Sequence, residues 1–211
     1  MKYVSKNQLQ RYPVYHKLLL NHLKNGEEFI SSRVIAAELG YSEEQVRKDL
    51  QAITTYPGTP KRGRNLNELV LSLEEFLGYN DMSQAILIGV GHLGAALLNY
   101  KLFPQMGLKI IEAFDNDPKK VGLTINNIEV KDYSSIKEFI KSSGVKIAIL
   151  CIPGENLQVI VDEIVKMGIV GIWNFAPGVI NVSDRITVQN VDLASSFAVL
   201  THNMKQKIKA K

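Results

Sequence analysis

The sequence predicts an α/β protein in which a helical amino-terminal domain precedes a doubly wound parallel sheet. Three observations lead to this class. Apolar residues recur at helical spacing up to Gly78; beyond it, short runs rich in Ile and Val alternate with helical stretches; and a glycine-rich turn follows the first of these runs. Because parallel strands need helical crossovers, the alternation indicates a sheet covered by helices on both faces.

Four helices are expected in the amino-terminal domain, which we place at residues 1–80. They span residues 8–24, 33–39, 42–53 and 67–77. Ser31 and Ser32 can cap the second helix, and a capping-box pattern from Ser42 to Gln45 opens the third. The second and third helices, joined at Gly40, form a helix-turn-helix candidate. A segment rich in Pro, Gly and Thr precedes the fourth helix and predicts a hairpin or a flexible loop.

Strands and helices alternate through the second domain, residues 81–192. The expected strands span residues 84–89, 109–114, 145–152, 170–174 and 186–191. The expected helices span residues 93–102, 134–143 and 156–167, and a last helix with a lysine-rich end occupies 193–211. This order is typical of a doubly wound fold.

The composition excludes several classes of protein. It is 45% hydrophobic and 22% charged over 211 residues, as in ordinary folded domains. No apolar run reaches the roughly 20 residues of a membrane helix, and the amino terminus lacks a secretory signal. We therefore expect a cytoplasmic protein without a membrane partner. Cys151 lies in an apolar run, which favours a buried, inert thiol.

The pattern Gly89-x-Gly91-x-x-Gly94 lies between a predicted strand and a predicted helix, as in dinucleotide-binding domains. Gly89 permits the tight turn, Gly91 lets the backbone approach a pyrophosphate, and Gly94 allows close helix packing. The helix amino terminus offers free amides to the anion. Asp115, about 20 residues further on, would accept the ribose hydroxyls, which favours NAD(H) over NADP(H). The alternative is an empty domain in which Asp115 caps a turn.

Histidine in the glycine turn suggests a catalytic role, but the backbone amide of His92 is the group expected to contact phosphate. The four histidines show no metal or triad spacing with Cys, Asp or Glu: His16, His22, His92 and His202. We expect neither a metal site nor a catalytic nucleophile.

The third helix has the features of a DNA-recognition helix. Its first residues, from Ser42 on, would face base edges: Gln45 suits adenine, Arg47 suits guanine or phosphate, and Lys48 reaches the backbone. The net charge of +4 is too small to indicate nucleic acid by itself. The alternative interpretation is an amphipathic helix with a solvated face.

A basic loop follows this helix and strengthens the DNA hypothesis. Lys61, Arg62 and Arg64 alternate with Gly and Pro, a pattern that suits a narrow, A·T-rich minor groove. Charge runs of this kind are also found as simple solvated loops.

Together these motifs resemble the Rex family of bacterial redox-sensing transcriptional repressors over nearly the whole chain. The matching segments are QVRKDL at 45–50, GVGHLGAALLNY at 89–100, AFDNDPKKVG at 113–122, NFAP at 174–177 and NVDLA at 190–194. The resemblance implies a winged-helix domain, a Rossmann domain, and a homodimer in which the last helix is swapped onto the partner. It also implies that operator DNA is bound when NAD⁺ prevails and released when NADH binds.

The resemblance also assigns residues to sites. The cofactor-binding set is Gly89, Val90, Gly91, His92, Leu93, Gly94, Tyr100, Asp115, Asn116, Cys151, Ile152, Pro153, Phe175 and Ala176. Tyr100 would lie near the nicotinamide, and Asp192 would respond to the cofactor's redox state. In some members this acid pairs with an arginine on the first helix. Lys17 stands at that position here, and lysine lacks the bidentate fork.

The chain departs from the family after the recognition helix, where KDLSYFG and a KRGVGY-like wing are replaced by KDLQAITTYPGTPKRGRNLN. The operator is therefore not inferred from the family. Two other functions stay open: a small NAD-dependent oxidoreductase and a CoA-binding Rossmann module. Against an enzyme, no stretch is large enough for a substrate domain, and no acid–base pair accompanies the nicotinamide end. We expect the dinucleotide to be a signal.

Overall fold

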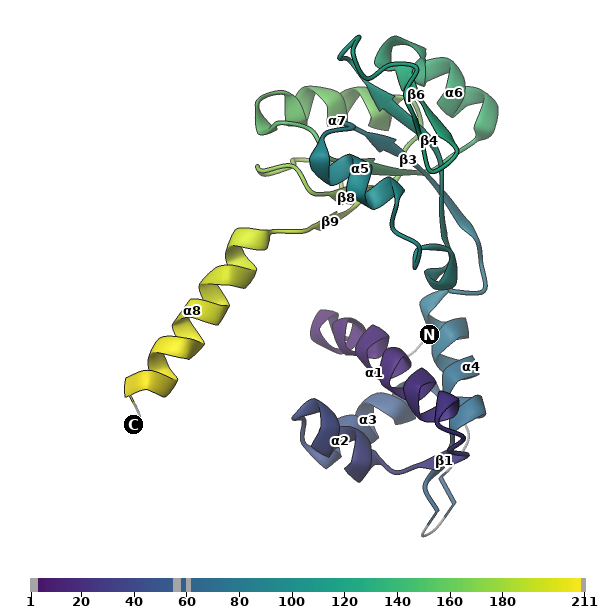
Figure 1. Cartoon of the computed structure of the whole chain (residues 1–211), viewed down its shortest axis with the longest axis vertical. Helices are drawn as coiled ribbons and strands as arrows, with labels where there is room; N and C mark the ends of the chain where they lie inside the picture. Colours follow the sequence, from purple (N-terminus) through teal and green to yellow (C-terminus); the bar gives the residue numbers. More distant parts are fainter. Residues whose placement is uncertain (1–3, 55–57, 60–61, 210–211) are drawn as a thin grey trace. The chain divides into compact units, whose positions relative to one another are not determined.

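A computed structural model describes residues 4–54, 58–59 and 62–209 (Figure 1). The chain divides into two compact units, Met1–Asp81 and Met82–Lys211, and each has its own hydrophobic core. Within the described ranges, no helix combines the length and apolar character needed to cross a bilayer.

The first unit is a helix-turn-helix with a small two-stranded wing. Its helices are α1 (Lys6–Lys24), α2 (Ser32–Leu39), α3 (Glu43–Ile53) and α4 (Leu66–Leu77), and its strands are β1 (Phe29–Ile30) and β2 (Arg64–Asn65), paired antiparallel. Gly40 ends α2 at φ +69°, a left-handed conformation that favours glycine and turns the chain into α3. Thr59 and Gly63 form a further antiparallel bridge next to the wing.

The capping box predicted at the start of α3 forms only in half. Ser42 Oγ accepts a hydrogen bond from the Gln45 amide at 3.2 Å, as expected. The side chain of Gln45 turns to Arg11 of α1, so it does not complete the box. A guanidinium is a charged donor and makes a stronger hydrogen bond than a neutral backbone amide.

The second unit contains a seven-stranded sheet. Its strands are β3 (Ser83–Ile88), β4 (Leu108–Asp115), β5 (Thr124–Ile125), β6 (Ile128–Asp132), β7 (Ile147–Leu150), β8 (Gly171–Asn174) and β9 (Thr187–Asn190). The strand order is β5-β6-β4-β3-β7-β8-β9, and every pair is parallel except β5 with β6. The helices are α5 (His92–Leu98), α6 (Ile136–Ser143), α7 (Leu157–Lys166) and α8 (Leu193–Lys209). This architecture confirms the predicted fold class.

Two features of the sheet domain differ from the sequence prediction. The β5–β6 hairpin at the sheet edge was not predicted, since its strands are short; its signal is the turn at Asn126 and Asn127, with φ +50° and +63°. Helix α5 ends at Leu98 and does not continue to residue 102. Asn99 closes it, because both its backbone and side-chain nitrogens donate to Ala95 O.

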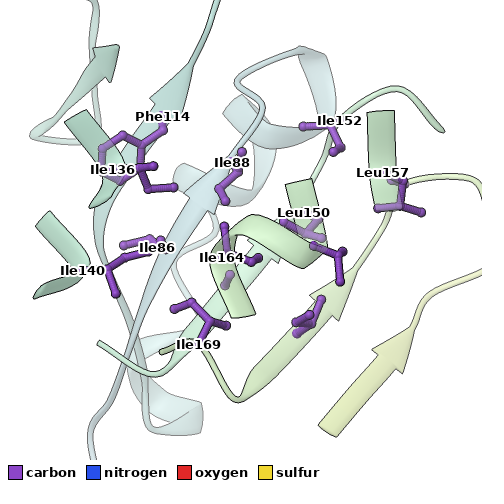
Figure 2. Close-up of a cluster of buried hydrophobic side chains, with 14 of the residues drawn as sticks. Ile86, Ile88, Phe114, Ile136, Ile140, Leu150, Ile152, Leu157, Ile164 and Ile169 are labelled. Carbon is purple, nitrogen blue, oxygen red and sulfur yellow. The ribbon is translucent and has the colours of Figure 1, made fainter. Parts of the chain in front are cut away.

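Both faces of the sheet are buried, as a doubly wound fold requires. Ile86 and Ile88 of β3 point into a cluster with α6 and α7 (Figure 2). The alternate residues Ala85 and Leu87 point to the opposite face and pack with Leu98 of α5. Because successive side chains of a strand point to opposite faces, the continuous apolar run of β3 contributes to the hydrophobic core on each face of the sheet.

Candidate functional site

The glycine turn between β3 and α5 is held by close backbone packing. Gly89 has φ +93°, and a side chain there would bring Cβ to 2.6 Å from Cys151 O. Gly94 is tighter, because its Cβ would lie 2.1 Å from Gly89 O. Both positions exclude any larger residue for steric reasons, as the proposed roles of tight turn and close helix packing require.

Gly91 differs from the other two glycines of the turn. It has φ −82°, and a Cβ added there would meet nothing within 4 Å. Glycine is therefore not required by the fold of the chain at this position. The open space beside its backbone fits the approach of a pyrophosphate, which a side chain would obstruct.

Asp115, at the end of β4, ties the glycine turn to the following loop. Its Oδ2 accepts from Val90 N at 2.6 Å and from Lys120 Nζ at 3.0 Å, and its Oδ1 accepts from Asp117 N at 2.9 Å. Burial alone raises the pKa of Asp115, but the bonds from Asp117, Val90 and Lys120 outweigh it and lower the pKa below its ordinary value. The carboxylate is therefore ionised. Oδ1 accepts from one of the three donors and Oδ2 from the other two, which leaves a lone pair on Oδ1.

The turn and Asp115 border a cavity of about 480 Å³, within the size range of small-molecule sites. It is lined by Ile88, Gly89, Gly91, Leu93, Asp115, Asn116, Lys120, Tyr133, Cys151, Ile152, Pro153, Asn156, Ile160 and Phe175. Nine of the predicted cofactor residues are therefore brought together: Gly89, Gly91, Leu93, Asp115, Asn116, Cys151, Ile152, Pro153 and Phe175.

The remaining members of the predicted set lie elsewhere. Val90 donates its amide to Asp115 and Gly94 packs against Gly89 O, so both residues hold the turn in place. His92 is exposed at the start of α5. Ala176 borders a separate hollow, where its amide donates to Asn174 Oδ1 at 3.0 Å. Tyr100 follows the end of α5 and lines a different hollow, 4.8 Å from Phe103 between ring centroids.

Sequence reasoning did not select five of the residues that line the cavity: Ile88, Lys120, Tyr133, Asn156 and Ile160. Lys120 belongs to the segment AFDNDPKKVG named above. Its position five residues after Asp115 could have predicted that the two side chains meet. The hydroxyl of Tyr133 donates to Glu163 Oε2 at 2.8 Å, and burial raises its pKa.

The titratable groups of the cavity are poorly suited to acid–base catalysis near neutral pH. Burial raises the pKa of Cys151 to about 12, so the thiol stays protonated. Asp115 is held ionised by Lys120 and backbone amides. Among the described residues no group of three or more His, Cys, Asp or Glu side chains could hold a metal ion.

The predicted DNA-binding residues of the first unit lie at the start of α3 and in the wing. Ser42 caps α3, Arg47 is exposed, and exposed Lys48 pairs with Glu44 at 2.8 Å. Gln45 is half-buried beside α1.

In the wing, the guanidinium carbon of Arg62 lies 4.2 Å from the centre of the Phe29 ring. Arg64 is half-buried within β2, and burial lowers its pKa. Lys61 lies outside the described residues.

A buried ion pair beneath α3 was missed by sequence reasoning. Asp49 is 3% exposed, and its two carboxylate oxygens lie 2.6 Å and 2.8 Å from Arg11 Nε and Nη2. Tyr15 donates to the same carboxylate at 2.7 Å, and Tyr12 donates to Asp49 O at 3.0 Å. Asp49 therefore anchors α3 to α1.

The predicted redox-switch residues belong to different units. Lys17 is exposed on α1. Asp192 is exposed at the start of α8, where Oδ1 accepts from the amides of Ala194 and Ser195. The hydrogen bond from the Ser195 hydroxyl, with these amides, lowers the pKa of Asp192. Its pairing with Lys17 stays a prediction.

Family models match both units. Residues 80–178 match a model described as a CoA binding domain, and residues 3–51 match one described as a putative DNA-binding protein N-terminus.

Similarity to individual proteins extends over almost the whole chain. Redox-sensing transcriptional repressor Rex of Clostridium botulinum (strain Alaska E43, type E3) is 36% identical over 97% of each chain, and that of strain Hall is 36% identical over 95% of each. RSP, a Rex-family repressor, matches in its crystal structure at a TM-score of 0.87, with 35% identity over 98% of this chain and 96% of RSP.

Two further crystal structures of RSP carry ligands. The complex with β-NADH matches at a TM-score of 0.89, with 34% identity over 100% of both chains. The complex with β-NAD⁺ and operator DNA matches at 0.88, with 34% identity over 100% of this chain and 99% of that one. The chain described here belongs to the Rex family of redox-sensing transcriptional repressors.

Proposed function

We propose that this protein is a transcriptional repressor that binds operator DNA as a homodimer and leaves it when NADH replaces NAD⁺. The observation that carries the proposal is the combination, in one chain, of a glycine-turn cavity and a winged helix-turn-helix in which Arg47 and Lys48 are exposed on α3. RSP, at 34% identity, has been crystallised with NADH and with NAD⁺ and operator DNA, which supports the same ligands for this chain.

In this proposal residues 1–80 bind DNA, residues 81–192 bind NAD(H) and residues 193–211 exchange between protomers. The protein then works where the DNA is, in the bacterial cytoplasm. Supporting the exchange, α8 has no buried residue within its described length. One helical stripe of α8 is apolar and exposed, and consists of Leu193, Phe197, Leu200, Met204 and Ile208. Such a stripe is stable in water when another chain covers it.

The cavity residues suit a sensor of nicotinamide charge. Gly91 leaves room for the pyrophosphate, and Asp115 can accept from a ribose hydroxyl through Oδ1. NAD⁺ and NADH differ by a hydride and by the positive charge of the nicotinamide ring. Ile152 and Phe175 give the lining an apolar part, which disfavours a charged ring and so favours NADH. A ligand shifts a conformational equilibrium only through such a difference in affinity.

We further propose that the protein is not an enzyme. Cys151, Asp115, Lys120 and Tyr133 are the titratable side chains among the described residues that line the cavity. Each is either paired or has a pKa far from neutrality, as described above. None is placed to exchange a proton with a substrate at physiological pH.

The test is fluorescence anisotropy of the full chain on DNA selected from random sequence, titrated separately with NAD⁺ and NADH at fixed salt. Fixed salt is needed because phosphate contacts make affinity steeply salt-dependent. We expect NADH to release the DNA at concentrations at which NAD⁺ does not. Steady oxidation of NADH by a small carbonyl compound would favour the oxidoreductase alternative, and CoA binding without a response to NADH would favour the CoA-binding one.

A further inference from the structure

The wing of the first unit holds an arginine against an aromatic ring. The guanidinium carbon of Arg62 lies 4.2 Å from the centre of the Phe29 ring, well inside the roughly 6 Å of a cation–π contact. Phe29 belongs to β1, whereas Arg62 lies in the loop that leads into β2, so the contact joins the two sides of the wing. Ile30, the next residue of β1, is buried in the core. Because successive side chains of a strand point to opposite faces, half-buried Phe29 presents its ring on the face away from that core.

The backbone next to Arg62 is fixed by its packing against β1. Gly63 has φ +92°, and a side chain there would bring Cβ to 2.4 Å from Ile30 O and 3.0 Å from Ser31 N. Thr59 O accepts from the amides of Arg62 at 3.2 Å and of Gly63 at 3.0 Å, and Thr59 N donates to Gly63 O at 2.6 Å. Arg62 therefore leaves the loop from a hydrogen-bonded turn that lies directly on β1.

The contact with Phe29 holds the guanidinium without using up its hydrogen-bond donors. The ring attracts the cation through its π electrons and supplies no lone pair. No ion pair between described residues involves Arg62. Most of the five N–H groups of Arg62 therefore remain for phosphate or base acceptors. Of the two described arginines of the wing, Arg62 is the exposed one, since Arg64 is half-buried within β2.

A restrained arginine binds DNA more favourably than a free one. An exposed arginine samples many rotamers, and a DNA contact that orders the side chain loses that entropy. A side chain that is already held in one place loses less entropy on binding, so affinity rises without an added contact.

We propose that Phe29 is a positioning residue for DNA binding, whose ring holds the Arg62 guanidinium at the place on the wing surface from which it contacts DNA. Phe29 acts through Arg62 and makes no DNA contact of its own. The inference rests on the proposed function and adds to it an aromatic residue outside the basic motif.

The experiment measures anisotropy of the full-length protein on DNA that the wild type has selected from random sequence. Arg62→Ala should weaken binding about tenfold and reduce the slope of affinity against salt by about one. Phe29→Leu keeps an apolar side chain but loses the ring, and should weaken binding about two- to fivefold, as for an exposed cation–π contact. Its salt slope should equal that of the wild type, because the charge of Arg62 remains. Phe29→Tyr keeps the ring face and should bind within about 1.5-fold of the wild type.

A double variant separates positioning from a general effect on the wing. Once Arg62→Ala is present, Phe29→Leu should weaken binding no further, whereas independent effects would multiply. Phe76→Leu removes another half-buried ring of the same unit, which packs on Tyr12 at 5.2 Å between centroids, and should leave DNA affinity unchanged. Thermal unfolding checks that each variant folds. Phe29→Ile, which suits a strand better, takes the place of Phe29→Leu if that variant does not fold.

The inference is overturned if Phe29→Tyr binds as weakly as Phe29→Leu, if the losses of Phe29→Leu and Arg62→Ala multiply, or if either single variant binds like the wild type. In all these cases NADH-dependent release of the wild type would leave the proposed function standing. Failure to select any DNA would overturn the proposed function and this inference together.

Discussion

The candidate site of the first unit is formed by side chains, whereas that of the second unit is formed largely by backbone. In the first unit, side chains such as Arg47 and Lys48 project from α3, and a buried pair between Arg11 and Asp49 holds that helix from below. In the second unit, the backbone around Gly91 faces the ligand space, and tight packing at Gly94 holds it.

The difference follows from the proposed ligands. A DNA groove is entered by protruding side chains, whereas a pyrophosphate is bound by backbone amides that any side chain would cover. Surface substitutions on α3 should therefore change binding and spare the fold. In the glycine turn, one added methyl group should destroy either the fold or the binding, depending on which glycine receives it.

The largest effect is expected at Gly94. In Gly94→Ala the new Cβ would overlap Gly89 O, and relief of the overlap requires α5 to move away from β3. We expect a loss of about 3 kcal/mol or more in the free energy of unfolding, measured by urea denaturation. The matched control is Gly91→Ala, which should unfold within about 1 kcal/mol of the wild type yet lose NADH affinity. Equal stability of the two variants would contradict the distinction between these glycines.

The buried pair of the first unit comes next. Asp49→Asn leaves the Arg11 guanidinium without its carboxylate, and we expect a destabilisation of about 3 kcal/mol, the lower end for a broken buried ion pair. Thermal and urea unfolding would measure it. Glu44→Ala removes the acid of an exposed pair and should leave the free energy of unfolding nearly unchanged. A neutral outcome for Asp49→Asn would mean that α3 does not depend on this anchor.

A smaller effect, on binding alone, is expected for Arg47→Ala. Loss of one base or phosphate contact should weaken operator binding by about 2 kcal/mol, measured by anisotropy, with unfolding and NADH affinity near normal. Lys24→Ala, at the exposed end of α1, serves as a control of equal charge. Parallel loss of DNA and NADH binding would contradict the separation of the two sites.

The smallest effect concerns pH and the Asp115–Lys120 pair. The pKa of Asp115 is lower in the folded protein than in the unfolded chain, where it is about 4. The ionised carboxylate therefore stabilises the fold above pH 4, and this stabilisation is lost as the pH falls through the pKa of the folded protein. Lys120→Met should lower the free energy of unfolding by about 1 kcal/mol at pH 7 and by less near pH 3. Exposed Lys119 provides the matched control in Lys119→Met. A difference that grows toward acid pH would reverse the assigned sign.

Much of the fold and part of the cavity could be predicted because they depend on local requirements. The alternation of apolar runs predicted the parallel sheet, and the spacing of Gly89, Gly91 and Gly94 predicted the turn. Their functional roles stay predictions for the binding experiments. The edge hairpin of β5 and β6 escaped notice, since strands this short carry too few residues for a periodic pattern.

The sequence by itself determined the class of fold, the glycine turn and the helix that carries Arg47 and Lys48, because periodicity and backbone sterics act over a few neighbouring residues. Only the tertiary structure decided which side chains meet. Arg11 and Asp49 are 38 positions apart, and their pairing depends on how α1 packs on α3. The same packing places Gln45 of α3 beside Arg11 of α1, which the residue types alone did not predict.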